Sequence, residues 1–200
     1  MNTRERIILA SKSPRRARLL TQIGLSFEVL PAEIEEEIVN AGSPAGLAMA
    51  LARLKAEAAA QNAGHGLIIG ADTVVSLDDS MLGKPKNAKE AASMLGMLSG
   101  RTHHVYTGFT LLQTGGGSII DYADTAVTFK PLEDWEIDLY VATGSPLDKA
   151  GAYGIQDVSS LFVTGIEGCF YNVVGLPLNR FYHALTDLWG SKRVQQALTP

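Results

Sequence analysis

Runs of apolar residues, and their alternation with polar ones, divide the chain into short strand-like and helix-like segments. Continuous apolar runs at residues 7–10 and 67–75 predict strands that are buried on both faces. Residues 103–112 predict a long strand, which a glycine turn at 115–117 separates from further sheet. The remaining strands are expected at residues 27–30, 119–122, 124–129, 161–163 and 170–171.

Capping residues mark the helices between these strands. A serine followed by a proline, at residues 13–14 and again at 43–44, places an N-cap directly before a favoured first helical residue. The two helices are expected to end near Gly24 and Gly64. Further helices are expected at residues 87–100 and 133–142 and after residue 176, and the tail after residue 190 is expected to be loose.

Strands and helices therefore mix along the chain, separated by glycine breaks and at least two hairpins. This order predicts an α/β fold with a mixed sheet flanked by helices. The length of 200 residues suits one domain over residues 1–200, built as two small lobes that share a core. Hydrophobic residues make up 46% of the chain, which is enough apolar material for that core.

The net charge and the cysteine content limit the ligands, the metal sites and the cellular compartment that we expect. The net charge of -4 does not indicate the basic surface that binds nucleic acid. Because the chain is negative overall, an anionic ligand must be held by a local cluster of basic residues. Cys169 is the only cysteine, which excludes an internal disulfide and any multi-cysteine metal site and fits a reducing compartment. No apolar run approaches the length of a membrane span. We therefore expect a cytoplasmic protein without a nucleic-acid or membrane partner.

The segment Ser-Lys-Ser-Pro-Arg-Arg at residues 11–16 carries unusual chemistry for the start of a helix. A helix N-terminus is partially positive, so Arg15 and Arg16 are each unfavourable there by about 0.3–1 kcal/mol unless an anion binds beside them and neutralises their charge. Free N–H groups, the Ser11 hydroxyl and two guanidinium groups would together form a phosphate cradle. The alternative is that both arginines simply point into water.

Carboxylates in unusual places are the next candidates. Asp72 interrupts a buried strand, where it is costly unless it is paired, binds a metal or faces a cleft. The alternative is a buried aspartate that caps a nearby turn. Glu36 belongs to an acidic run, which is commonly a solvated face. Asp148 opens a glycine-rich loop over residues 148–156, whose composition suits close approach of the backbone to a ligand.

Neither the dinucleotide-binding glycine fingerprint nor the P-loop motif occurs, and no serine lies in a nucleophile elbow. What remains is a scattered set of basic groups and carboxylates. That set suits hydrolysis of a polyphosphate, in which basic groups spread the negative charge, a carboxylate orients water and a divalent metal bridges oxygens. Its members are Arg15, Arg16, Lys55, Lys84, Lys149, Glu36, Asp72 and Asp148.

Several ordered motifs extend this interpretation. They lie at residues 9–16, 70–75, 83–85, 98–103, 148–156 and 175–177. On these motifs the chain resembles the Maf family, the septum-formation-inhibitor-like nucleoside triphosphate pyrophosphatases, from residue 8 to about residue 185. It departs from the family's usual pattern at Lys12, where glycine is common, and at Cys169, where serine is common. Neither position is one to which we assign catalysis.

The resemblance implies an α/β fold with a cleft between two lobes. It also implies hydrolysis of a nucleoside triphosphate to the monophosphate and pyrophosphate with a divalent metal such as Mg, Mn or Co. Asp72 matches the proton acceptor for the attacking water, and Glu36 matches a carboxylate that joins Asp72 at the metal. The positions that match phosphate-handling residues are Ser11, Arg15, Arg16, Lys55 and Lys84. The positions linked to base choice are Arg15, Thr73 and Gln156.

The branch of the family follows from two of these residues. Thr73 after Asp72, and Gln156 after Gly-Ile, resemble the dTTP and UTP pyrophosphatases, whereas the branch that acts on 7-methyl-GTP has Gln and Glu at these two places. An amide offers a donor and an acceptor, which can pair with O4 and N3–H of uracil or thymine. The alternatives are a pyrophosphatase for 7-methyl-GTP or another non-canonical nucleotide, and a nucleotide-binding regulator of cell division. A homodimer is compatible with the sequence, which identifies no patch for it.

Overall fold

One mixed sheet organises the computed structural model, which describes residues 5–32, 34, 41–78 and 80–198. Within these ranges seven strands follow the order β2-β1-β3-β5-β6-β7, with β4 also paired to β3. β1 is parallel to β2 and β3, and the other pairs are antiparallel. The expected α/β class is thereby confirmed. The strands are β1 (Ile7–Leu9), β2 (Glu28–Val29), β3 (Leu67–Leu77), β4 (Ser80–Leu82), β5 (Thr102–Gln113), β6 (Ser118–Phe129) and β7 (Val163–Glu167).

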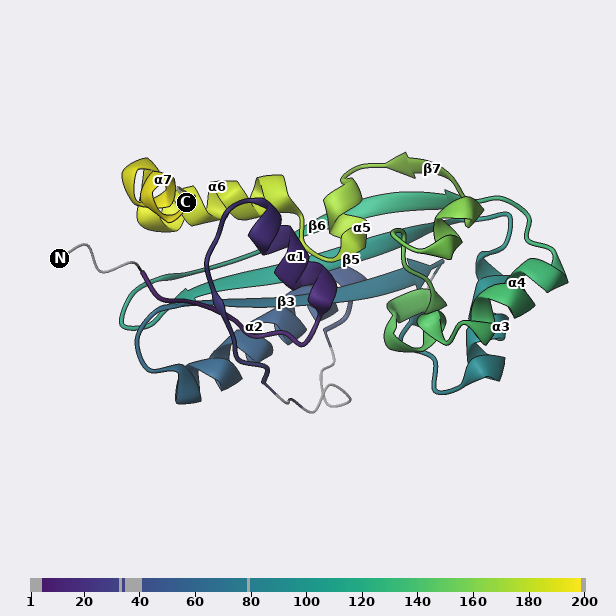
Figure 1. Ribbon diagram of the computed structural model, residues 1–200, viewed down its shortest axis with the longest axis horizontal. Helices are drawn as coiled ribbons and strands as arrows, with labels where there is room; N and C mark the ends of the chain where they lie inside the picture. The colour runs from purple at the N-terminus through teal and green to yellow at the C-terminus, as the bar shows by residue number, and fades with distance from the viewer. Residues whose placement is uncertain (1–4, 33, 35–40, 79, 199–200) are drawn as a thin grey trace.

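Helices cover both faces of the sheet (Figure 1). The helix α2 lies along one side of the long strands β3 and β5, and α1 and α6 pack against the other side. The helices α3 and α4 gather at the far end of the strands, beside the short 3-10 helices. The helices are α1 (Pro14–Gln22), α2 (Pro44–Ala63), α3 (Ala88–Leu98), α4 (Asp134–Ala142), α5 (Phe170–Val174), α6 (Leu178–Trp189), α7 (Ser191–Leu198), η2 (Ser145–Asp148), η3 (Ala150–Ala152) and η4 (Val158–Phe162).

Hydrogen bonds confirm the N-caps predicted at Ser13 and Ser43 and show a third at Asn87, where the helix over residues 87–100 was expected to begin. The side chains of Ser13, Ser43 and Asn87 each accept a bond from the backbone N–H three residues later. These bonds satisfy donors that the first turn of a helix otherwise leaves unpaired, which is why the helices begin where they do.

Three predictions for the C-terminal part are wrong. Residues 161–163 were expected as a strand, but residues 161 and 162 end the 3-10 helix η4, which the Asp157 side chain caps, and β7 begins only at Val163. Residues 170–171, expected as a strand, begin the helix α5, because Asn172 is drawn into the sheet by hydrogen bonds to Thr107 and Val105. The tail after residue 190, expected to be loose, forms the helix α7. Its Val194 is buried in the core, and Arg193 donates hydrogen bonds to the side chains of Glu5 and Gln113. Those contacts join residues far apart in sequence, so local patterns do not contain them.

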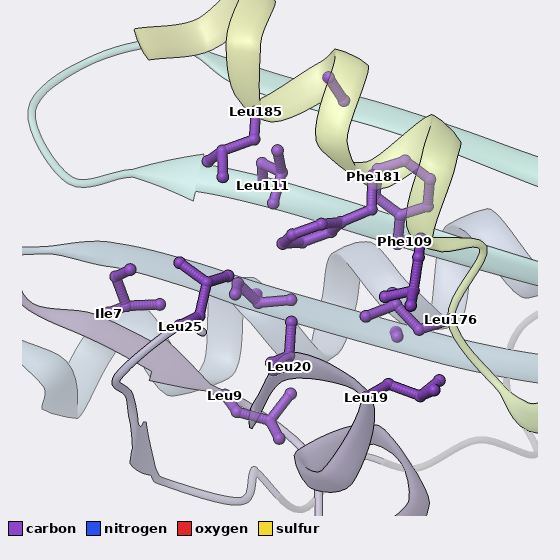
Figure 2. Close-up of a cluster of buried hydrophobic side chains, with 14 of the residues drawn as sticks. Ile7, Leu9, Leu19, Leu20, Leu25, Phe109, Leu111, Leu176, Phe181 and Leu185 are labelled. Carbon is purple, nitrogen blue, oxygen red and sulfur yellow. The ribbon is translucent and has the colours of Figure 1, made fainter. Parts of the chain in front are cut away.

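Besides a small cluster of buried side chains between α2 and the sheet, two larger clusters lie toward the two ends of the long strands. One cluster fills the space between the sheet and α1 and α6, where Leu20, Phe109 and Phe181 meet (Figure 2). A second cluster lies under α3 and α4 and includes Phe129 and Tyr140. The polar cleft described below lies between the elements that these two clusters support.

Close packing of α2 on the sheet depends on two glycines. A Cβ atom at Gly70 of β3 would lie 2.1 Å from the Ala52 carbonyl oxygen, and one at Gly108 of β5 would lie 2.4 Å from the Ala48 carbonyl carbon. Neither separation is sterically allowed, so only glycine lets the helix come this close. This approach brings Lys55, on the same helix, within reach of β3.

Candidate active site

A polar cleft of about 560 Å³ opens between the start of α1, the edge of β3 and the segment around η2 and η3. Six basic side chains line it, namely Lys12, Arg15, Arg16, Lys55, Lys84 and Lys149, against the two carboxylates Asp72 and Asp148. The described cleft is therefore strongly positive in a chain whose net charge is -4. The expected local basic cluster is present, and a polyanion is the ligand that it attracts.

The order of strands explains why β3 is open to this cleft. β1 pairs with β3 up to Ile69, and β4 pairs with it only from Val75 onward. Between those two points no described strand covers that edge of β3. Asp72 and Thr73 lie in this interval and both line the cleft. Two polar side chains in the middle of the otherwise buried strand β3 therefore reach the cleft.

Asp72 is paired within the cleft. Its Oδ1 accepts a hydrogen bond of 2.6 Å from Nζ of Lys55, and each side chain is 14% exposed. The cationic partner offsets the cost of placing a carboxylate in a buried strand. The alternative prediction, that Asp72 caps a turn, is wrong. The second carboxylate oxygen takes no hydrogen bond from a described residue and remains available to water or to a cation.

Arg16 is buried and spans three segments of the chain. Its Nη1 donates to Ser11 Oγ at 3.1 Å, its Nη2 to Thr73 Oγ1 at 3.0 Å and its Nε to the Gly175 carbonyl oxygen at 2.9 Å. The alternative that both arginines point into water is therefore wrong for Arg16. Oxygen atoms of the protein accept hydrogen bonds from its guanidinium group. Arg16 thereby links the start of α1 to β3 and to the end of α5.

Arg15 reaches across the cleft instead. Its Nη1 lies 3.3 Å from Oδ2 of Asp148, whose Oδ1 accepts a 2.6 Å bond from Nζ of Lys149. Partial burial alone would raise the pKa of Asp148, but the bonds from Lys149 and Arg15 outweigh it and the pKa is lowered. Asp148 is thus an anion held between two cations, in a place where a phosphate would meet the same partners.

Lys149 is held from behind by residues that the sequence analysis did not identify. Its Nζ also donates to the Ser145 hydroxyl at 3.0 Å and lies 3.6 Å from Oδ2 of Asp157. Burial would raise the pKa of Asp157, yet the hydrogen bonds it accepts, chiefly from Ser159, lower it. The only sequence signal for this group is the density of short polar residues after the glycine-rich loop.

The inner wall of the cleft includes Tyr153, which sequence analysis also missed. Its hydroxyl lies 2.8 Å from Nε2 of His103, and burial lowers the pKa of that histidine to about 4. Burial likewise raises the pKa of the Tyr153 phenol. Both groups are therefore neutral at physiological pH. Their arrangement gives His103 a structural role, and His104, the next residue of the strand, faces the opposite side and contacts Asp124.

Most of the predicted site residues meet in this cleft. They are Ser11, Arg15, Arg16, Lys55, Asp72, Thr73, Lys84 and Lys149. Gln156 does not meet them in this structure, since its side chain is exposed on a turn outside the cleft lining. Glu36, the second predicted metal ligand, lies outside the described residues.

Within the described part of the chain, no group of three or more His, Cys, Asp or Glu side chains is arranged to hold a metal ion. Asp72 contributes one carboxylate to the cleft. Mg²⁺ is commonly bound through one or two carboxylates together with substrate phosphates, so a single carboxylate with an available oxygen fits that pattern. Across the same described ranges, no helix has the length and apolar character needed to cross a membrane.

Comparison with known proteins gives matches that cover most of the chain. The family model described as "Maf-like protein" matches residues 6–188. A dTTP/UTP pyrophosphatase of Carboxydothermus hydrogenoformans is 49% identical over 92% of this chain and 99% of its own. The dTTP/UTP pyrophosphatase of Bacillus cytotoxicus is 49% identical over 90% of this chain and 94% of its own. That of Moorella thermoacetica is 48% identical over 92% of this chain and 98% of its own.

A solved structure shares the fold at much lower identity. A HAM1 protein from Coxiella burnetii superposes with a TM-score of 0.50 and 15% identity, covering 92% of this chain and 99% of that one. At this identity the likeness bears on the fold alone.

Proposed function

The chain belongs to the Maf-like protein family, and from that premise we propose that it hydrolyses dTTP and UTP to the monophosphate and pyrophosphate. Relatives that carry this activity in their names are 48–49% identical over most of the chain. The observation that carries the proposal is the Lys55–Asp72 pair in a cleft lined by basic side chains. This arrangement combines a base for water with cations for a triphosphate.

In the mechanism that we infer, Asp72 accepts a proton from the water that attacks the α-phosphorus, and pyrophosphate leaves. Lys55 holds Oδ1 of Asp72 and leaves the other oxygen to orient the water. Arg15, Lys84 and Lys149 line the same cleft and offset charge on the leaving group. Arg16 acts mainly by fixing Ser11 and Thr73 in place.

A divalent cation, Mg, Mn or Co, is part of the proposal. When bound, it would polarise the phosphate oxygens and offset the charge that develops in the transition state. Asp72 would hold it together with phosphate oxygens of the substrate, and Glu36 is the second carboxylate that we propose for it. The Lys55 ammonium group lies 2.6 Å from Oδ1 of Asp72 and fixes the position of the carboxylate that would hold the cation.

Base choice is proposed to depend on Arg15, Thr73 and Gln156. Arg15 and Thr73 line the cleft, whereas the exposed Gln156 would have to meet the base at the cleft mouth. The preference for pyrimidines, the cytoplasmic location and a homodimer all remain predictions.

The proposal is tested by measuring pyrophosphate release from a panel of nucleoside triphosphates with Mg, Mn or Co. The assay is run on the wild-type protein and on the Asp72→Asn variant. Selective turnover of dTTP and UTP is expected, and Asp72→Asn should lower the rate by about 10²–10⁴ while nucleotide binding survives, because the size is kept and the base is lost. An unchanged rate in Asp72→Asn would remove that residue from the mechanism. Turnover of 7-methyl-GTP instead would assign the other branch. Tight binding without any turnover would favour the nucleotide-binding regulator.

A further inference from the structure

Behind Thr73 a row of polar groups continues from the cleft into the middle of the sheet. Nη2 of Arg16 lies 3.0 Å from Thr73 Oγ1, which lies 2.9 Å from Thr107 Oγ1. Thr107 Oγ1 in turn lies 2.8 Å from the backbone carbonyl oxygen of Asn172. Thr107 and Asn172 are both fully buried. Arg16 and Thr73 line the cleft, whereas Thr107 and Asn172 do not.

The two ends fix the direction of every hydrogen bond in the row. A guanidinium can only donate, and a carbonyl oxygen can only accept. The Thr107 hydroxyl must therefore donate to Asn172, since any other orientation would place two acceptors 2.8 Å apart. Its oxygen then accepts from Thr73. The single proton of the Thr73 hydroxyl is thus directed into the protein and away from the cleft.

Asn172 anchors the row and cannot turn over. Its Nδ2 donates to the Val105 carbonyl oxygen at 2.7 Å and to Thr125 Oγ1 at 2.9 Å. Its Oδ1 accepts from the Thr107 backbone N–H at 3.1 Å. Exchanging the amide nitrogen and oxygen would oppose donor to donor and acceptor to acceptor, so the network itself assigns the orientation. A buried polar group with every partner present holds one geometry.

Toward the cleft, Thr73 Oγ1 therefore offers only a lone pair. One lone pair accepts from Arg16 and the proton goes to Thr107, which leaves one acceptor position. Phosphate oxygens are acceptors, so this hydroxyl cannot hold them. The group that it suits is an N–H or O–H of the nucleoside.

We propose that Thr107 and Asn172 are positioning residues that hold the Thr73 hydroxyl as an acceptor for a donor group of the bound nucleoside. The inference rests on the proposed function. Two donors of a uridine nucleotide qualify, N3–H of the base and a ribose hydroxyl. Cytosine lacks the first, because its N3 is unprotonated, and a 3′-deoxyribose lacks a hydroxyl of the second kind.

The test compares kcat/KM for UTP, CTP and 3′-deoxy-UTP in Thr107→Val and Thr107→Ser. Valine keeps the volume and frees the Thr73 proton, so the preference for UTP over at least one of the other two should fall by about three- to tenfold, as expected for one neutral hydrogen bond. Serine keeps the hydroxyl and should keep the preference. A fall against CTP assigns N3–H, and a fall against 3′-deoxy-UTP assigns the sugar.

Thr110→Val is the matched control. Thr110 lies on the same strand, its hydroxyl is buried, and it has no hydrogen-bond partner among the described residues. This variant should keep the wild-type preference. Thermal unfolding checks that every variant is folded.

Equal preferences in Thr107→Val and wild type would overturn the inference. If Thr107→Val does not fold, Thr73→Ser and Thr73→Val replace the pair. The half-buried position 73 accommodates both, and the inference requires serine to keep the preference and valine to lose it. Failure of the proposed function is distinct, because wild type would then not release pyrophosphate from UTP at all.

Discussion

Single side chains in this protein take their properties from burial more than from residue type. Asp72 keeps its place in a buried strand because Lys55 lies 2.6 Å away. His103, on the neighbouring strand, has only Tyr153 as a partner for one ring nitrogen, and the other nitrogen has none among the described residues. Protonating this ring would bury a charge without a counterion, which is why its pKa falls to about 4.

His103 should therefore make the fold sensitive to acid. Below pH 6.5 the unfolded chain binds a proton at this residue and the folded chain does not, so stability falls as the pH falls toward 4. Between pH 7 and pH 5 this loss is about 2 kcal/mol. His103→Gln should remove most of it, as measured by urea unfolding at the two pH values.

The exposed neighbour supplies the control for this measurement. His104→Gln should keep the acid-dependent loss, because His104 lies at the surface beside Asp124. Equal losses in His103→Gln and wild type would show that His103 does not cause the effect.

Sequence analysis identified most residues of the cleft but not the tasks that they divide. Arg15 and Arg16 are adjacent, yet one crosses the cleft and the other is buried. What separates them is the Gly175 carbonyl oxygen, which lies 159 positions along the chain from Arg16. Tyr153 was missed for the same reason, since its partner His103 comes from β5, and the bond from Tyr140 of α4 to Asp157 was missed likewise. No local pattern contains such contacts.

At the scale of elements, the placement of α2 on β3 and β5 brings Lys55 and Asp72, the pair for which we propose a catalytic role, together. Lys55 belongs to the helix and Asp72 to the strand, and Gly70 and Gly108 set the distance between them. The predicted boundaries of α1, α2 and α3 were accurate because their caps are local. α5 and α7 were not anticipated, because tertiary contacts determine them.

Gly108→Ala should push α2 away from the sheet. The added methyl group would lie 2.4 Å from backbone of α2, so the free energy of unfolding should fall by about 3 kcal/mol. Activity should fall as well, because Lys55 would lose its alignment with Asp72. Denaturant unfolding and UTP turnover measure the two effects.

A second glycine on another element shows whether the effect is specific. Gly96 lies within α3 and has open space around an added Cβ, so Gly96→Ala should stabilise the helix by about 0.5–1 kcal/mol. A similar loss in both variants, or none in Gly108→Ala, would contradict the packing argument.

For the molecule as a whole, the cleft gathers positive charge against the overall balance. Arg15 and Lys149 come from opposite walls, and Asp148 lies between them. Its side chain is 61% exposed, so this bridge adds at most about 1 kcal/mol to stability. A phosphate group would have to share the same cations with this carboxylate.

Asp148→Asn should therefore strengthen substrate binding. KM for UTP is expected to fall a few-fold, and the unfolding free energy should change by less than about 1 kcal/mol. Asp78→Asn is the control, because Asp78 forms a comparable exposed pair with Arg101 and does not line the cleft. A higher KM in Asp148→Asn would mean that Asp148 holds the cations in a productive position.

The most direct test of the account is to hydrolyse UTP in water enriched in ¹⁸O and to locate the label in the products by mass spectrometry. Attack of an Asp72-activated water at the α-phosphorus predicts UMP and pyrophosphate as products, with one ¹⁸O in the UMP. Label in the pyrophosphate, or release of UDP and inorganic phosphate, would contradict the proposed reaction.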